Sequence, residues 1–139
     1  MDKEVIIDEN KYHMISSTTD SNGIIVEVNQ DLCDISSYTK EELLGKSHNI
    51  VRHPDMPKSI FKDMWETIKS GKTWKGVVKN LDSKGDYYWV RATISPILNK
   101  DLEQTYTSIR VPINDSDKEY YSKLYRELLI KENLKIKLP

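Results

Sequence analysis

The segment from Asn49 to Pro57 gathers side chains that can bind a polar ligand. Arg52 offers several N–H donors in a planar fork, which suits a phosphate or a polar heterocycle, and His53 can donate, accept or carry a charge. Two prolines disfavour helical geometry in the residues before them, so the segment should form a stiff lead into a helix. The same residues also fit a structural role, in which Arg52 is solvated and Asp55 caps the helix.

Strand periodicity places Asn80 on an apolar face of a strand expected from Trp74 to Asn80. One face carries Trp74, Gly76, Val78 and Asn80, and the other carries Lys75, Val77 and Lys79, which we expect to face solvent. A buried side-chain amide without hydrogen-bond partners costs about 1–3 kcal/mol, so Asn80 requires a hydrogen-bond partner. Its carbonyl and NH2 match the acceptor and donor edge of a flavin ring. The structural alternative is a hydrogen bond to the turn that follows.

Two tryptophans and a second asparagine are further candidates. Trp65 lies on the apolar stripe of an expected helix, and Trp74 begins the strand after it. Indole rings either stack on a planar cofactor or fill a core, and core filling is the commoner use. Asn29 ends an expected strand and can offer a polar contact, but it also fits as the N-cap of a helix from Gln30.

The elements that must position these residues begin with a hairpin. An Asn-Gly pair lies between two β-rich segments, 14–19 and 24–29, and predicts a tight turn between two strands. Short helices are expected over 30–46, where Thr39 and Glu42 have the spacing of a capping box.

A longer helix is expected to stop at Gly71, because one apolar stripe precedes this glycine at helical spacing. The stripe consists of Ile60, Phe61, Met64, Trp65 and Ile68. Three strands are then expected over 74–80, 87–98 and 105–111. In the final helix, Ser116 and Glu119 form a second capping-box pattern, and its apolar face consists of Tyr121, Leu124, Tyr125 and Leu128.

This order predicts an α+β fold, with a five-stranded antiparallel sheet, short helices over one face and a C-terminal helix. We divide the chain into a lead or cap over residues 1–12, a sensor domain over 13–113 and a C-terminal signalling or docking helix over 114–139.

Composition narrows the function classes. The chain has 139 residues, which suits one domain, and its 21 basic residues nearly balance its 22 acidic ones, so no basic field suggests nucleic acid. No apolar run approaches the roughly 20 residues of a membrane helix. Cys33 is the single cysteine and cannot form an internal disulfide, which favours a reducing cytosol.

Taken together, several segments of the chain resemble the PAS domains of bacterial aerotaxis and energy-taxis receptors of the Aer type. The resemblance runs from about Ser17 to Arg110. It is carried by Ser17-Thr-Thr-Asp20, Ser37-Tyr-Thr39, His48-Asn-Ile-Val-Arg-His-Pro-Asp-Met-Pro-Lys58, Asp63-Met-Trp65, Trp74-Lys-Gly-Val-Val-Lys-Asn80 and Gly85-Asp-Tyr-Tyr-Trp-Val-Arg-Ala92. The turn Leu81-Asp-Ser-Lys84 departs from the more basic turn usual in the family, which bears on partner contacts more than on the cofactor.

The resemblance implies a PAS fold that binds FAD non-covalently and reports redox or energy state. Two tryptophans would form aromatic walls, one asparagine would contact the polar edge of the isoalloxazine ring, and the Arg-His-Asp cluster would shape and support the site. The implied cofactor-binding residues are Asn29, Arg52, His53, Asp55, Trp65, Trp74 and Asn80.

The resemblance also implies partners. These are a chemotaxis-type membrane signalling protein or its HAMP and signalling domains, and a second PAS copy in a homodimer; neither nucleic acid nor direct membrane insertion is implied. The expected location is the cytoplasm, with membrane association only through a partner. Full receptors continue into a membrane anchor, so we expect either an excised domain or a stand-alone PAS protein. The terminal helix either docks to a partner or packs on its own domain.

Other readings remain open on the residues alone. A heme-binding gas sensor would use His13, His48 or His53 as an axial ligand. A cofactor-free interaction module would leave Asn80 and the tryptophans as core features. We do not expect an enzyme, because the sequence contains no dinucleotide loop, nucleophile elbow or paired-carboxylate site. Cys33 lies outside the motif that a flavin photoadduct requires.

Overall fold

The computed structural model describes residues 3–8, 11 and 14–137, with side chains as far as residue 134. His13, one of the candidate heme ligands, lies outside the described residues. The elements, in chain order, are β1 (Ile15–Asp20), β2 (Ile25–Val28), α1 (Gln30–Ser36), α2 (Lys40–Leu43), the 3-10 helix η1 (His48–Val51), α3 (Lys58–Lys69), β3 (Trp74–Leu81), β4 (Tyr87–Leu98), β5 (Gln104–Pro112) and α4 (Asp115–Lys137).

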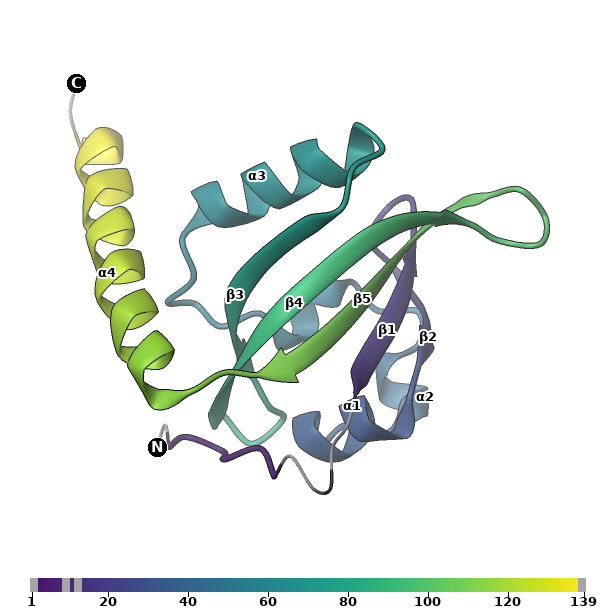
Figure 1. The fold of residues 1–139 in the computed structure, drawn as a ribbon, viewed down its shortest axis with the longest axis horizontal. Coiled ribbons are helices and arrows are strands. Elements are labelled where there is room, and N and C mark those ends of the chain that lie inside the picture. Colours follow the sequence, from purple (N-terminus) through teal and green to yellow (C-terminus); the bar gives the residue numbers. More distant parts are fainter. Residues whose placement is uncertain (1–2, 9–10, 12–13, 138–139) are drawn as a thin grey trace.

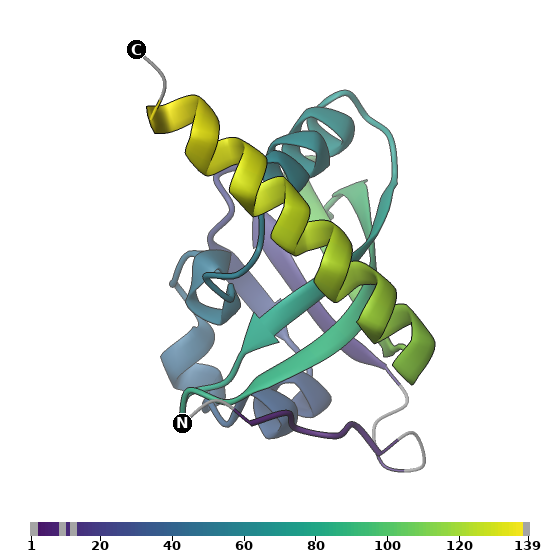
Figure 2. The same cartoon turned by 90° about the vertical axis from the view of Figure 1, so that its left-hand side faces the viewer.

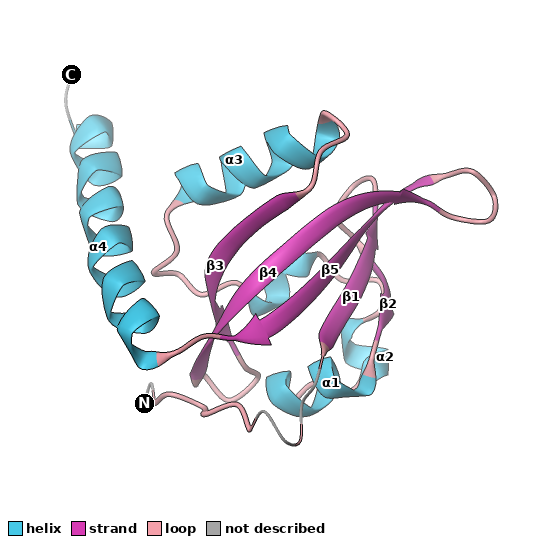
Figure 3. Ribbon diagram, viewed as in Figure 1, coloured by secondary structure: helices cyan, strands magenta, loops and turns pink. Residues whose placement is uncertain are grey.

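The five strands form one antiparallel sheet in the order β2-β1-β5-β4-β3. Helices α1, α2, η1 and α3 lie on one face of this sheet, whereas α4 lies beyond β3, outside this layer of helices (Figures 1 and 3). We call the face toward α3 the inner face; it carries Asn80 of β3 and Arg110 of β5. The predicted α+β architecture is therefore confirmed, including the positions of all five strands to within two residues at either end.

Local signals account for the first half of the fold. Asp20 Oδ1 accepts hydrogen bonds from the Asn22 and Ile24 amides, and Gly23 takes a positive φ of 81° to close the predicted hairpin. The capping box of Thr39 and Glu42 is also present at the start of α2.

Two predicted helix caps are wrong. The N-cap of α3 is Pro57, which has no side-chain acceptor, and the carboxylate of Asp55 instead pairs with Lys79 at 3.0 Å. At the start of α4, Asn114 Oδ1 rather than Ser116 accepts the amide hydrogen of Asp117, at 2.8 Å. In both cases the predicted cap has a suitable residue type, but the helix begins elsewhere: α3 begins at Lys58 and α4 begins at Asp115.

Helix α4 lies over β3 and β4 on the outer face of the sheet, which is the face opposite the inner face (Figure 2). The hydroxyl of Tyr125 donates to the carbonyl oxygen of Val77, and the ring of Tyr125 stacks on Trp89 with ring centroids 6.2 Å apart. The expectation that Val77 and Lys79 face solvent is therefore wrong: Val77 is fully buried and Lys79 is partly buried, because α4 covers this part of the outer face. Lys75 is exposed, as expected.

The N-terminal segment packs against the start of β4. The Val5 amide donates to the carbonyl oxygen of Tyr87 at 2.7 Å, and the Tyr87 amide donates to that of Lys3 at 3.0 Å. Glu4 pairs with Lys118 of α4 at 2.9 Å. This segment therefore extends the sheet where β5 has turned away toward α4.

Candidate cofactor pocket

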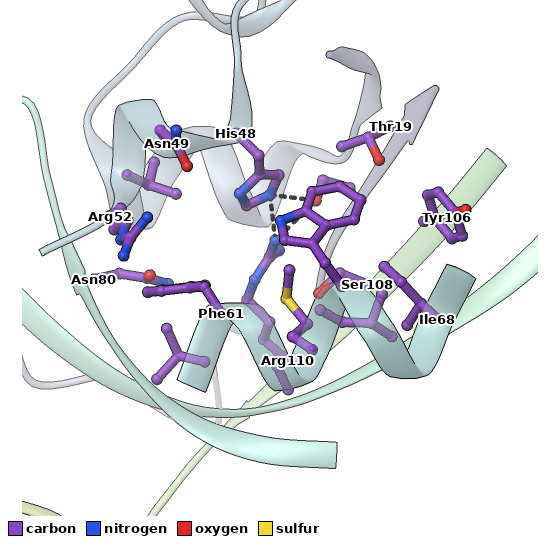
Figure 4. A pocket seen from close by; sticks show the side chains of 17 residues that line it. Thr19, His48, Asn49, Arg52, Phe61, Ile68, Asn80, Tyr106, Ser108 and Arg110 are labelled. Carbon is purple, nitrogen blue, oxygen red and sulfur yellow. Dashed lines mark hydrogen bonds between the residues drawn. The ribbon is translucent and has the colours of Figure 1, made fainter. Parts of the chain in front are cut away.

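A cavity lies between α3 and the inner face of the sheet (Figure 4). It encloses about 80 Å³ of space that the centre of a water molecule can reach. We call the cluster of Ser17, His48, Ser108 and Arg110 its polar end; most of the remaining lining is aromatic or aliphatic. The lining residues are Ser17, Thr19, His48, Asn49, Val51, Arg52, Phe61, Met64, Trp65, Ile68, Val78, Asn80, Ala92, Ile94, Tyr106, Ser108 and Arg110.

The polar end is built around Arg110, of which only 3% is exposed. Its Nη2 donates to Ser17 Oγ at 2.8 Å and to His48 Nε2 at 2.6 Å. Neither Arg110 Nη1 nor Ser108 Oγ has a hydrogen-bond partner among the described residues. No Asp or Glu occurs among the described residues that line the cavity. A buried cation with neutral partners favours an anionic or electron-rich group beside it, because such a group offsets its desolvation.

His48 must be neutral in this arrangement. Burial of the ring, reinforced by the positive charge of Arg110, lowers the pKa of His48 from 6.5 to about 3. Its Nε2 accepts the hydrogen bond from Arg110, so we assign the ring proton to Nδ1. Burial also raises the pKa of the nearby Tyr88 to about 12, with Arg110 acting in the opposite direction. Arg110 therefore carries the positive charge of this cluster.

Arg52 and Asn80 meet at the edge of the sheet. The backbone after η1 forms a β-bridge that pairs Arg52 with Asn80, because β3 is an edge strand with free hydrogen-bonding groups. The guanidinium of Arg52 lies 3.9 Å from the centre of the Phe61 ring, and both side chains line the cavity. Asn80 is 3% exposed and faces the cavity from the sheet, on the side that strand periodicity predicts.

The two candidate tryptophans have different positions. Trp65 lines the cavity and meets Tyr106 edge to face, with ring centroids 5.8 Å apart. Trp74 is buried, but it lies outside the lining: its Nε1 donates to Asp63 of α3 at 2.9 Å, and its ring covers Gly76, where a Cβ atom would come within 2.3 Å of it. Gly76 therefore leaves the space that the Trp74 ring occupies.

His53 and Asp55 also lie outside the cavity lining. The His53 ring is buried, and its Nδ1 accepts the Asp55 amide hydrogen at 3.0 Å. Burial alone would raise the pKa of the Asp55 carboxyl, but its hydrogen bond with Lys79 and that residue's charge give a net lowering. These two residues hold the lead into α3 against β3, on the side of the sheet that α4 covers.

Asn29 lies outside the lining as well. Its Oδ1 accepts the amide hydrogens of Leu32 and Ser16, and its Nδ2 donates to the carbonyl oxygen of Met14. These contacts cap α1 and tie it to β1.

Sequence reasoning missed the polar end of the cavity. Ser17 and His48 lie in segments that carry the family resemblance, and His48 was considered only as an axial heme ligand. No local signal indicated that both would contact Arg110. The alternation of β5 could have placed Tyr106, Ser108 and Arg110 together on the inner face. A strand-end arginine is more often solvated, so its burial depends on partners from β1 and η1 that are distant in sequence.

No helix within the described residues is long and apolar enough to cross a membrane. Across the same residues, no group of three or more His, Cys, Asp and Glu side chains is arranged to hold a metal ion.

Comparison with known proteins identifies the family. A family profile described as the PAS fold matches residues 25–110. The chain belongs to the PAS-fold family. The aerotaxis receptor of Escherichia coli (strain K12) is 44% identical over 114 residues, which are 82% of this chain and 22% of that protein. This PAS chain therefore spans about a fifth of the length of that relative.

Solved structures agree on the PAS fold. The PAS domain of a Colwellia psychrerythraea protein superposes with a TM-score of 0.65 at 20% identity, covering 74% of this chain and 88% of the other. A light-oxygen-voltage domain studied with a flavin analogue superposes with a TM-score of 0.67 at 14% identity, covering 93% of each chain. At these identities the likeness shows the fold alone.

The contacts of Asn29 predict a structural effect for its replacement. We expect Asn29→Ala to lower the free energy of unfolding by about 1 kcal/mol, because α1 loses its N-cap, while binding of added FAD is unchanged. Urea unfolding and a flavin titration measure the two effects. Gln30→Ala, at the exposed neighbouring position, is the control. Loss of flavin binding at unchanged stability would show that Asn29 acts in the cofactor site.

The lowered pKa of His48 predicts a loss of stability in acid. Between pH 6.5 and about 3 the unfolded chain binds a proton at His48 that the folded chain does not, so stability decreases as the pH falls through this range. We expect the free energy of unfolding to decrease by about 1–2 kcal/mol from pH 7 to pH 5 through this group. His48→Gln should flatten this part of the profile in urea unfolding. Equal pH dependence in both proteins would contradict the assignment.

Proposed function

We propose that this PAS domain binds FAD non-covalently between α3 and the inner face of the sheet, and that it reports redox or energy state in bacterial aerotaxis or energy taxis. The observation that carries the proposal is the buried Arg110, whose Nη1 has no hydrogen-bond partner among the described residues and which faces a cavity whose described lining lacks carboxylates. The 44% identity to an aerotaxis receptor supports the signalling context.

The chemistry of the lining fits the isoalloxazine ring system. Its pyrimidine edge is rich in acceptors and carries negative charge when the ring is reduced, so it suits Arg110, Ser108 and the amide of Asn80. Its flat, apolar remainder suits the aromatic and aliphatic lining, from which Phe61 and Trp65 project on α3.

The size of the cavity adds a condition. Ligand pockets usually enclose about 300–1,000 Å³, whereas this cavity encloses about 80 Å³, which is room for a few water molecules. A three-ring group would therefore enter only if cavity-lining side chains on α3, or α3 itself, moved. The stacked pair of Arg52 and Phe61 lies on that side of the cavity.

A bound flavin would supply reversible electron transfer, since its charge and hydrogen-bonding pattern differ between the oxidised and reduced forms. The protein's part is to detect that difference. Asn80 lies in β3 beside Arg52, so a change in its hydrogen bonds would reach both the sheet and the lead into α3. Signalling requires contacts that differ between the two states.

The proposed partner is a chemotaxis-type membrane signalling protein or its HAMP and signalling domains, with PAS homodimerisation as a second interaction. The proposed setting is the cytoplasm. We propose a sensor role without catalysis, in which Arg52 and His53 serve the pocket and its support rather than a reaction.

The visible spectrum of the freshly purified protein, followed by identification of the released cofactor, tests the binding proposal. We expect a two-banded flavin spectrum and release of FAD, with about one FAD bound per chain after titration. Arg110→Gln should weaken FAD binding at least tenfold, because the polar end loses its charge. Arg91→Gln, on the outer face, should bind normally. A sharp Soret band would indicate heme instead, and a colourless protein that does not bind added FAD would indicate an interaction module.

Asn80→Ala tests the sensing step separately. We expect this variant to retain flavin but to lose the conformational difference between oxidised and reduced protein, because the side chain proposed to hydrogen-bond to the ring is absent. Limited proteolysis of the oxidised and dithionite-reduced forms measures that difference. A redox-dependent pattern identical to that of the wild type would contradict the role of Asn80.

A further inference from the structure

The start of α3 is capped by a residue from the far end of the chain. Pro57 provides no side-chain cap, and the amides of Lys58 and Ser59 donate instead to the two carboxylate oxygens of Glu132 in α4, at 3.2 and 2.9 Å. Free amides and the helix dipole make the first turn of a helix a favourable place for a carboxylate. The cap therefore joins two helices through residues that are 74 and 73 positions apart.

Glu132 also interacts with the cavity lining. Burial lowers the pKa of the Arg52 guanidinium, and the negative charge of Glu132 acts in the opposite direction, so the two groups attract each other. For Glu132 itself, burial would raise the pKa, but the hydrogen bonds from Ser59 and Lys58 give a net lowering. The Glu132 carboxylate is therefore charged at neutral pH, as an arginine guanidinium is, and its charge acts on Arg52, which lines the cavity and stacks on Phe61 of α3.

Other polar contacts of α4 lie in its earlier turns, at Asp117, Lys118 and Tyr125. Tyr125 holds the middle of α4 to β3 and β4 on the outer face, through Val77 and Trp89. Glu132 holds its later turns to α3, the helix whose residues wall the cavity. A shift of α3 or Arg52 would thus disturb the later turns of α4 before it disturbed the Tyr125 contact.

We propose that Glu132, Arg52 and the first turn of α3 form an electrostatic latch that couples the occupancy of the cavity to the docking of α4. A ligand larger than the present cavity displaces α3 side chains, and an electron-rich ligand attracts Arg52 toward itself; both changes weaken the contacts of Glu132. Coupling is reciprocal, so release of Glu132 favours the ligand. The ligand half of this inference rests on the proposed function, whereas the link between α3 and α4 does not.

Hydrogen–deuterium exchange of the full chain tests the latch without a ligand. We expect Glu132→Ala to speed exchange about fivefold in the first turn of α3 and in α4 after residue 128, the factor expected for the loss of one helix cap of typical strength. Glu127→Ala removes an exposed carboxylate about one and a half turns earlier on the same helix and should change neither region. Glu132→Gln, which keeps the shape and one acceptor, should fall between wild type and Glu132→Ala.

Arg52→Gln tests the electrostatic part. We expect it to speed exchange in α4 after residue 128, although Arg52 belongs to the lead into α3. Combining it with Glu132→Ala should add nothing, because both changes disable one unit. Additive effects of the two substitutions, or a Glu132→Ala protein that matches Glu127→Ala, would overturn the latch.

Added FAD then tests the coupling to ligand. In the wild type we expect FAD to speed exchange in α4 after residue 128, and in Glu132→Ala we expect no further increase and tighter FAD binding. An equal response of α4 to FAD in both proteins would overturn the coupling. A chain that binds no FAD would overturn the proposed function, and the ligand-free comparisons would still decide whether the latch exists.

Discussion

Arg110 keeps a positive charge inside the fold, and its hydrogen bonds go to Ser17 and His48 instead of a carboxylate. Removing a charge from water costs several kcal/mol unless other groups compensate, so much of the surrounding structure follows from this placement. It keeps His48 neutral and joins β5 to β1 and η1. It also leaves hydrogen-bonding capacity at Nη1 of a residue that lines a cavity whose other lining is largely apolar. A PAS sheet alone would not specify a ligand; this charge favours one with an electron-rich edge.

Helix α3 forms one wall of that cavity. It is attached at its start by a carboxylate from α4 and, further along, by the hydrogen bond between Asp63 and Trp74. Because its own N-cap lacks an acceptor, the stability of its first turn depends on where α4 lies. The ligand site and the C-terminal helix are thus joined by a few polar contacts at one corner of the fold, in addition to the packing of α4 on the sheet.

How far the sequence predicted this arrangement depended on the range of each signal. The hairpin at Gly23 and the inward position of Asn80 are local, and turn chemistry and strand period predicted both. The cap of α3 was mispredicted because its carboxylate comes from Glu132 rather than nearby Asp55. Val77 was assigned to solvent because strand period does not reveal that α4 covers the outer face. Arg110 was missed because its burial depends on Ser17 and His48, 93 and 62 residues away.

The three tryptophans provide the most direct test that the ligand lies between α3 and the inner face. Trp65 lines the cavity, Trp74 lies beside it, and Trp89 lies on the outer face beneath α4. Their indole N–H signals can be assigned by single Trp→Phe substitutions and followed by ¹⁵N NMR while FAD is added. We expect the Trp65 signal to shift most and its shift to saturate at one FAD per chain. Binding of FAD that leaves the Trp65 signal in place would contradict this placement of the ligand.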